Sequence, residues 1–198
     1  HLPNVYVYGT RKEVAVPWLA DPKPTAHISL ADLGMCYRDS GDKCPRKAYV
    51  KADPERVLQW KSLFDSWGKR PTIGIAWSGG TFLTQSSFRE VGVESFRALF
   101  DAVDANWVSL EYKDCTEQIA GTPVRWFARG TLPNDHEETA GMVGALDLVI
   151  GLHTSALHLA GAMGKRVICL VPEVPQWRYY RDDMPWYPDC RLYRKHAM

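Results

Sequence analysis

The chain has 198 residues, of which 45% are hydrophobic and 24% charged, a length and composition typical of one soluble globular domain with a modest appendage. Its formal net charge is only +1 at pH 7, so no global electrostatic field would draw it to nucleic acid or to an anionic membrane. The longest apolar stretch, residues 145–150, is interrupted by Asp147 and is too short to span a bilayer. We therefore expect neither a nucleic-acid partner nor a transmembrane segment.

The five cysteines are dispersed along the chain, without a Cys-x-x-Cys pair or a matching histidine spacing. This pattern predicts reduced thiols, no metal site and a cytoplasmic location. A Cys36–Cys44 bridge is the alternative for one pair of these thiols.

The first 52 residues contain several prolines and little sustained periodicity. The chain begins at His1 without a signal-peptide pattern, and residues 5–9 resemble a strand entered midway. We expect a fragment of a longer polypeptide. Residues 1–52 would be an irregular tail of a preceding lobe, with an edge segment at 26–30, and residues 53–198 would form the main domain.

A helix is expected to begin at Asp53-Pro54-Glu55, with Asp as the N-cap, Pro at the first helical position and Glu in the first turn. Apolar residues between 57 and 67, Leu58 among them, predict a buried stripe on this helix. Gly68 predicts its end.

From Thr72 onward, short apolar runs alternate with stretches of helical periodicity. Such alternation predicts βαβ units, and therefore a Rossmann-like α/β domain whose parallel sheet carries helices on both faces. The expected strands are 72–77, 107–110, 124–127, 148–150 and 166–171, and the expected helices are 94–103, 135–146 and 155–163. We expect the tail at 177–194 to form a closing helix and an aromatic lid, with Trp186 and Tyr187 mostly in the core.

Ligands of parallel sheets bind beyond the carboxyl ends of the strands. The sharpest candidate there is the helix start His153-Thr154-Ser155, which follows a strand ending at Gly151. Unpaired amides and hydroxyls at a helix start attract anions, and His158 lies one turn after Thr154 on the same side. The alternative interpretation is that Thr154 or Ser155 only caps the helix and that His158 is a hydrogen-bonded core histidine.

Two further candidates follow other strands. Ser78-Gly79-Gly80-Thr81 combines glycines that admit close approach with hydroxyls that can donate to phosphate, and Arg89 could add a bidentate contact. The alternatives are a plain turn and a surface arginine paired with Glu90. Glu111 directly follows a strand, where its carboxylate could bind ribose hydroxyls.

Several groups of residues follow one another in the order of a known family. They are Ile73-Gly74-Ile75-Ala76-Trp77-Ser78-Gly79, Glu138-Thr139-Ala140 with Leu146-Asp147-Leu148-Val149-Ile150, the segment from His153 to Lys165, and the tail motifs Trp177-Arg178-Tyr179-Tyr180, Pro185-Trp186-Tyr187-Pro188 and Arg191-Leu192-Tyr193-Arg194. Together they resemble the C-terminal domain of GT-B glycosyltransferases, in particular the heptosyltransferase-like family 9 and its tetratricopeptide-linked relatives.

The resemblance implies a glycosyltransferase half that binds a nucleoside diphosphate sugar, with no cofactor and no essential metal, for hexosyl or heptosyl transfer. Thr154, Ser155 and His158 would hold the diphosphate and the sugar, with the 78–81 loop on the same side. Glu111 would meet the ribose, and a loop from Ala128 to Leu132 would border the base. The catalytic base would lie on the preceding lobe, and the acceptor, whether glycan, lipid or protein, stays open.

His153 departs from the family pattern, because family 9 members usually carry an Asp at this position. A histidine there resembles the His-Thr pair of the O-linked N-acetylglucosamine transferases, so the donor sugar stays open. Two other functions fit the same residues: a binding module that has lost catalysis, and a nucleotide-sugar enzyme such as an epimerase.

Overall fold

In the computed structural model, residues 25–26, 44, 46–79, 90–131, 135–173, 175, 179–180 and 182–194 are described. The chain divides into two compact units, His1–Lys43 and Cys44–Met198, and every helix and strand of the described residues lies in the second unit. The strand expected at 5–9, nearly all of the edge segment at 26–30 and a Cys36–Cys44 bridge fall outside the described residues.

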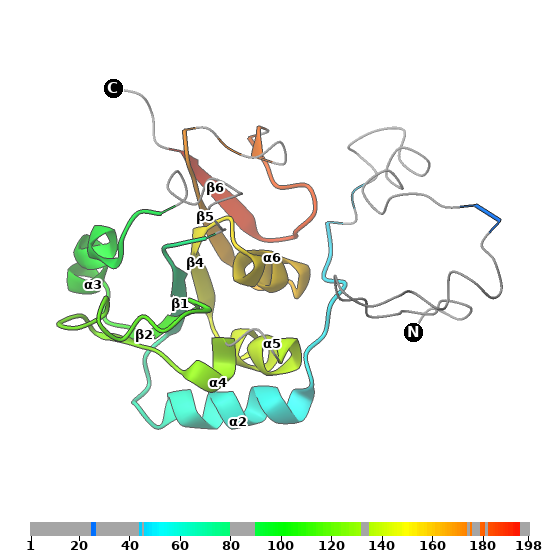
Figure 1. Ribbon diagram of the computed structural model, residues 1–198. Helices are drawn as coiled ribbons and strands as arrows, with labels where there is room; N and C mark the ends of the chain where they lie inside the picture. Colours follow the sequence, from blue (N-terminus) through cyan, green and yellow to red (C-terminus); the bar gives the residue numbers. More distant parts are fainter. Residues whose placement is uncertain are drawn as a thin grey trace. The chain divides into compact units, whose positions relative to one another are not determined.

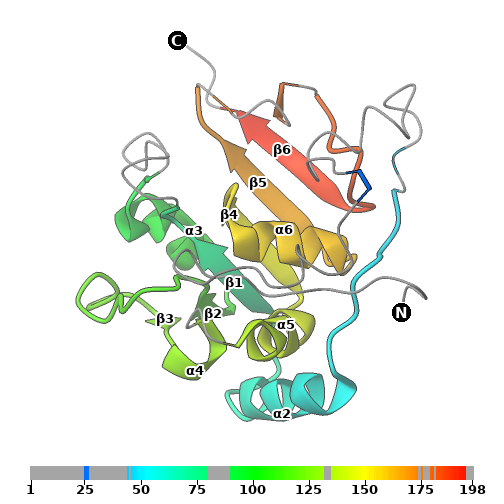
Figure 2. The same cartoon turned by 45° about the vertical axis from the view of Figure 1, so that its right-hand side comes forward.

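Six parallel strands form one sheet in the order β3-β2-β1-β4-β5-β6 (Figure 2). All five residues of β1 are buried, as expected for a central strand covered on both faces. The predicted Rossmann-like parallel sheet is therefore confirmed. The strands are β1 Thr72–Ala76, β2 Asn106–Ser109, β3 Val124–Arg125, β4 Leu148–Leu152, β5 Val167–Val171 and β6 Cys190–Arg194.

Helices cover both faces of this sheet (Figure 1). Alternating strand side chains sort the core into two clusters: Val149 packs with residues of α2, α5 and α6, whereas Ile150 packs with Phe96 of η5. The helices are α2 Pro54–Asp65, the 3-10 helix η5 Val93–Phe96, α3 Arg97–Ala102, α4 Ala128–Thr131, α5 His136–Gly144 and α6 Ser155–Ala162.

Helix α2 begins and ends where the local residues predict. The Asp53 side chain accepts a hydrogen bond from the Glu55 amide at 2.9 Å, and Gly68 adopts a φ of 112° just beyond the last turn. Trp60 and Phe64 are buried, but the expectation for Leu58 was wrong, because its side chain is 66% exposed. Leu58 therefore lies on the solvent-facing side of α2.

Glu138 joins α5 to α2. Its carboxylate accepts hydrogen bonds from Arg56 Nη1 at 2.8 Å and from Trp60 Nε1 at 3.0 Å. One turn later, Gly141 lies so close to α2 that a Cβ there would be 2.6 Å from the Cβ of Arg56. The acidic start of α5 therefore does more than complement the helix dipole: it fixes two helices to each other.

The tail differs from the expectation. Residues 190–194 form the edge strand β6, paired with β5, where no strand was expected. Tyr179 is in 3-10 helical conformation and residues 182–194 contain no helix, whereas residues 176–178 and 181 lie outside the described residues. Exposure alternates along β6, with Arg191 and Tyr193 outward and Leu192 inward, which is the period of a half-covered strand. Tyr187 is buried and Trp186 partly buried, as predicted for the aromatic part of the tail.

The thiols of the buried Cys169 and the half-buried Cys190 should make the stability of the fold depend on pH. Burial raises the pKa of Cys169 well above its usual 9.0 and that of Cys190 to about 12. Above about pH 9 the unfolded chain ionises Cys169 while the folded chain keeps it protonated, so the free energy of unfolding should fall by about 1.4 kcal/mol per pH unit. Denaturant titrations near pH 8 and pH 10 should show a weaker pH dependence for Cys169→Ala than for wild type. An identical slope would contradict this.

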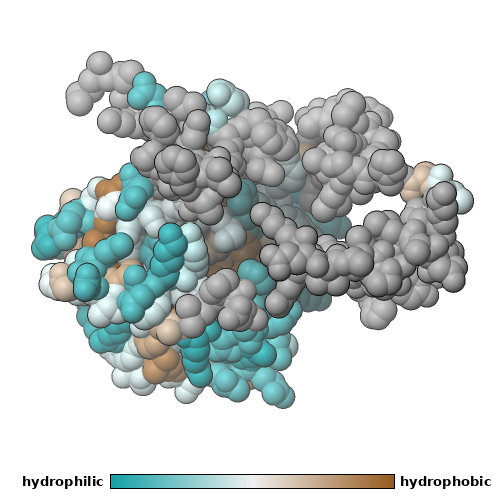
Figure 3. All heavy atoms as spheres, in the orientation of Figure 1, coloured by the Kyte–Doolittle hydropathy of each residue, from teal (hydrophilic) through white to brown (hydrophobic). Residues whose placement is uncertain are grey.

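The surface is mixed in character. Hydrophilic residues make up most of the coloured surface in Figure 3, with small apolar patches between them. Large exposed apolar side chains include Leu99 of α3 and Val103, which follows that helix, at 38% and 37% exposure. Within the part of the chain that the structure describes, every helix is too short or too polar to cross a membrane.

Candidate functional site

The loops that follow β1 and β4 meet at the carboxyl edge of the sheet. Gly151 of β4 lies against Ala76 of β1 so closely that a Cβ on residue 151 would be 2.3 Å from the Ala76 carbonyl oxygen. Just beyond, a Cβ on Gly79 would be 2.8 Å from Cγ2 of Thr154. The glycines therefore bring the start of the 78–81 loop against the start of α6.

The start of α6 is built as a capped helix terminus. A tight turn through His153 is closed by the Thr154 amide, which donates to the Leu152 carbonyl at 2.7 Å. Thr154 is the N-cap in extended conformation, and its hydroxyl accepts from the Leu157 amide at 3.5 Å. Ser155, the first helical residue, is exposed, so solvent reaches the first turn, whose amides lack acceptors within the helix.

Glu111 binds the loop after β1. The carboxylate oxygen Oε1 accepts from the amides of Trp77 at 2.8 Å and Ser78 at 2.9 Å, and Oε2 accepts from the Ser78 hydroxyl. The side chain is 5% exposed. These bonds already engage both carboxylate oxygens, so a ribose would have to share or replace one of them. The expected contact of Glu111 with a ribose stays a prediction. What the carboxylate does in this structure is fix the direction in which the chain leaves β1.

The segment expected as a loop from Ala128 to Leu132 is a helical turn as far as Thr131. Gly130 of this turn, α4, packs under α5, where a Cβ would lie 2.4 Å from Sδ of Met142. Trp126 ties the turn to the site, since its Nε1 lies 3.2 Å from the Glu111 carbonyl oxygen and 3.1 Å from Oγ1 of Thr131. A residue larger than glycine would not fit at this contact between α4 and α5.

His158 lies between two tyrosines. Its Nδ1 is 2.6 Å from the Tyr187 hydroxyl, and its Nε2 is 2.9 Å from the Tyr179 hydroxyl. A contact between this ring and a ligand would therefore have to replace or share one of these bonds. The predicted role of His158 in holding a diphosphate stays a prediction, and the geometry also matches the core histidine of the alternative interpretation.

His153 is only 5% exposed, and its ring packs on Tyr179 with 5.0 Å between ring centroids. Gly80, Thr81, Arg89 and Leu132 lie outside the described residues, so their predicted contacts are not placed. Among the residues that are described, no three His, Cys, Asp or Glu side chains gather in a way that could hold a metal ion.

No protein-family model matches the chain. Two solved structures share its fold. A family 9 glycosyl transferase from Veillonella parvula superposes with a TM-score of 0.55 at 11% identity, covering 76% of this chain and 44% of the other. ADP-heptose LPS heptosyltransferase II from E. coli gives a TM-score of 0.51 at 16% identity, covering 75% of this chain and 46% of the other. The fold is that of one half of a GT-B glycosyltransferase.

A sequence relative is much longer than this chain. FlbA of Caulobacter vibrioides is 28% identical over 173 residues, which cover 83% of this chain and 29% of FlbA. The chain thus spans less than a third of this relative and about half of each solved glycosyltransferase.

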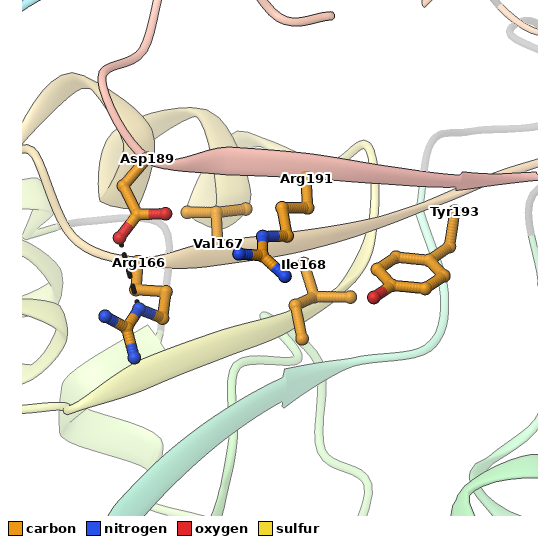
Figure 4. Close-up of a pocket in the computed structure, with 6 residues that line it drawn as sticks. All are labelled: Arg166, Val167, Ile168, Asp189, Arg191 and Tyr193. Atoms are coloured by element: carbon orange, nitrogen blue, oxygen red, sulfur yellow. Dashed lines mark hydrogen bonds and ion pairs between the residues drawn. The ribbon is translucent and has the colours of Figure 1, made fainter. Parts of the chain in front are cut away.

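A pocket of about 240 Å³ lies elsewhere on the Cys44–Met198 unit (Figure 4). Arg166 and Asp189 line the pocket at the amino ends of β5 and β6, where they form an ion pair at 3.1 Å. Arg191 and Tyr193 of β6 line it on the sheet face opposite α6. Because ligands of this fold class bind at the carboxyl ends of the strands, we do not assign the candidate site to this pocket.

Two residues that contact the candidate side chains are not evident as their partners from the sequence. Tyr179 lies in a tail motif, and Trp77 lies in a family motif at the end of an expected strand. In the structure, Tyr179 contacts His158 and Trp77 contacts Glu111. A signal for Tyr179 exists in hindsight, because a tyrosine among buried residues needs a hydrogen-bond partner for its hydroxyl. Residue type and spacing alone do not identify that partner.

Proposed function

We propose that the Cys44–Met198 unit is the donor-binding half of a glycosyltransferase that binds a nucleoside diphosphate sugar and transfers the sugar without a metal. The proposal rests on one observation: the start of α6 lies against Gly79, at the carboxyl edge of the sheet. The likeness of the fold to half of family 9 structures supports it.

A diphosphate suits this edge for electrostatic reasons. The first-turn amides of α6 and the positive end of its dipole favour an anion, at roughly 0.3–1 kcal/mol for each exposed contact. The half-buried Thr154 and the exposed Ser155 add hydroxyls beside these amides. Since the Ser78 hydroxyl is bound to Glu111, we expect the opposite loop to contact the ligand through its backbone from Gly79 onward. As sugar transfer leaves a nucleoside diphosphate, these groups would stabilise the departing charge.

The proposal does not specify the base or the sugar of the donor. The solved heptosyltransferase II is named for ADP-heptose, whereas His153 departs from the acid usual in family 9. A binding module without catalysis is the second candidate, favoured by the engagement of both His158 nitrogens by tyrosine hydroxyls. Titration calorimetry with ADP-, UDP- and GDP-sugars tests both proposals. Binding without any transfer by the longer protein would favour the module, and no binding at millimolar concentration would reject the donor site.

Removing the Thr154 hydroxyl should weaken the binding of a nucleoside diphosphate by about 1–2 kcal/mol, the scale of a lost hydrogen bond to a charged group. Calorimetry on Thr154→Ala measures this. Asp53→Ala is the matched control, because it removes the cap of α2 and should cost similar stability while leaving affinity unchanged. Equal affinity of Thr154→Ala and wild type, with both folded, would reduce Thr154 to a helix cap.

A further inference from the structure

Tyr187, His158 and Tyr179 form a hydrogen-bonded bridge along α6. The two tyrosine hydroxyls lie 2.6 Å from Nδ1 and 2.9 Å from Nε2 of the same imidazole ring. Tyr179 is fully buried and Tyr187 is 8% exposed. The Tyr187 ring also lies flush against Gly161, where a Cβ would be 2.4 Å from the ring. The bridge thus joins α6 to Tyr179 and Tyr187, which follow His158 by 21 and 29 positions in the sequence.

The chemistry of imidazole assigns different donor and acceptor roles to the two tyrosine hydroxyls. A neutral ring has one N–H donor and one acceptor nitrogen, so one tyrosine hydroxyl must donate to His158 while the other accepts from it. Both hydroxyl positions are then fixed. Tyr179 is held at a second point as well, since its backbone carbonyl accepts from the Arg194 guanidinium. With its backbone and its hydroxyl both fixed, the Tyr179 ring has little freedom to turn.

The fixed ring supports the start of α6. His153 packs on Tyr179 with 5.0 Å between centroids and an interplanar angle of 52°, and His153 immediately precedes the N-cap Thr154. We propose that His158 is a positioning residue of the donor site, which acts through Tyr179 to hold His153 and the turn before α6. The inference rests on the proposed donor function and assigns His158 a role other than contact with the diphosphate.

Two amide substitutions separate this role from direct contact. In Gln the terminal amide reaches the place of Nε2, and in Asn it reaches the place of Nδ1. His158→Gln can therefore keep the bond to Tyr179, whereas His158→Asn can keep only the bond to Tyr187. Among ADP, UDP and GDP, the probe is the one that the intact chain binds most tightly. We expect an affinity near wild type for His158→Gln and a loss of about tenfold for His158→Asn.

A double-mutant cycle completes the test. Tyr179→Phe should also cost about tenfold, and adding it to His158→Asn should cost no more, because both changes break one pathway. Multiplying losses, near a hundredfold, would mean that His158 and Tyr179 act independently and would overturn the proposal. Equal affinity of His158→Asn and wild type would overturn it too. The half-exposed Tyr193→Phe controls for removing a tyrosine hydroxyl and should leave affinity unchanged.

A readout without ligand distinguishes this inference from the donor function. In a chain labelled with ¹⁵N-histidine, Tyr179→Phe should shift the His153 ring resonances, because the ring that packs on His153 loses its anchor. If no nucleotide binds but the shift occurs, the donor function fails while the positioning contact stands. Unmoved His153 resonances in both Tyr179→Phe and His158→Asn would overturn the positioning role whatever the nucleotides do.

Discussion

Replacing Glu111 with Ala should lower the free energy of unfolding by about 3 kcal/mol, because buried donors lose a charged acceptor. Trp77 is fully buried, and its backbone amide loses its acceptor. The amide and the hydroxyl of Ser78 lose theirs as well. The same change should release the loop after β1, so nucleotide affinity should fall even at temperatures where the variant stays folded. Denaturant unfolding and calorimetry on one preparation measure both effects.

Glu111→Gln is the sharper comparison. Its amide oxygen can still accept the two backbone bonds, and only the charge and the bond from the Ser78 hydroxyl change, so we expect a loss of about 1 kcal/mol. Glu117→Ala removes an exposed carboxylate a few residues away and should change stability by less than about 0.5 kcal/mol. If Glu111→Ala were as stable as Glu117→Ala, the carboxylate would not be what holds this loop.

Gly151→Ala should cost about 3 kcal/mol or more, since the new methyl group would meet backbone atoms that cannot turn aside. Its Cβ would lie 2.3 Å from the carbonyl oxygen and 2.9 Å from the nitrogen of Ala76. To accept it, β4 must move away from β1, which separates the two loops of the candidate site. Thermal unfolding and nucleotide titration should both report the change.

Two variants locate the cause of that loss. Gly144→Ala places its methyl group 2.7 Å from a side-chain carbon of Val57, so repacking should limit the cost to about 1 kcal/mol. Ala76→Gly added to Gly151→Ala should rescue little, because the closest contacts are with the backbone of residue 76 and not with its side chain. Full rescue by Ala76→Gly would contradict this explanation.

Features with local causes could be predicted from the sequence. Asp53 and Pro54 determine where α2 begins through a cap and a fixed φ, and uninterrupted apolar runs identify the central strands. The edge strand β6 was missed because its outward residues, Arg191 and Tyr193, are polar or amphipathic, and the aromatic tail suggested a lid instead. Leu58 shows the reverse error, since an apolar residue in a helix need not face the core.

The candidate site could be predicted as a place but not as a set of contacts. The loops after β1 and β4 were selected by a rule about strand ends, and the structure brings Gly79 and Thr154 together there. The hydrogen bonds of the Glu111 carboxylate and the His158 ring join residues that are 21 to 34 positions apart in the sequence. Such pairings depend on how the strands are ordered in space, which residue types and spacing do not specify.

Strand order has one more consequence. In the strand order β3-β2-β1-β4-β5-β6, the chain continues from β1 to β2 and β3 on one side, and it then crosses back to β4 on the other side of β1. The helix that follows β4 lies on one face, whereas the Phe96 segment after β1 lies on the opposite face. The segments that follow β1 and β4 thus leave the sheet toward opposite faces, at the point where the strand order reverses. This divergence is created by connectivity, so the residues of the two loops can change without rebuilding the sheet.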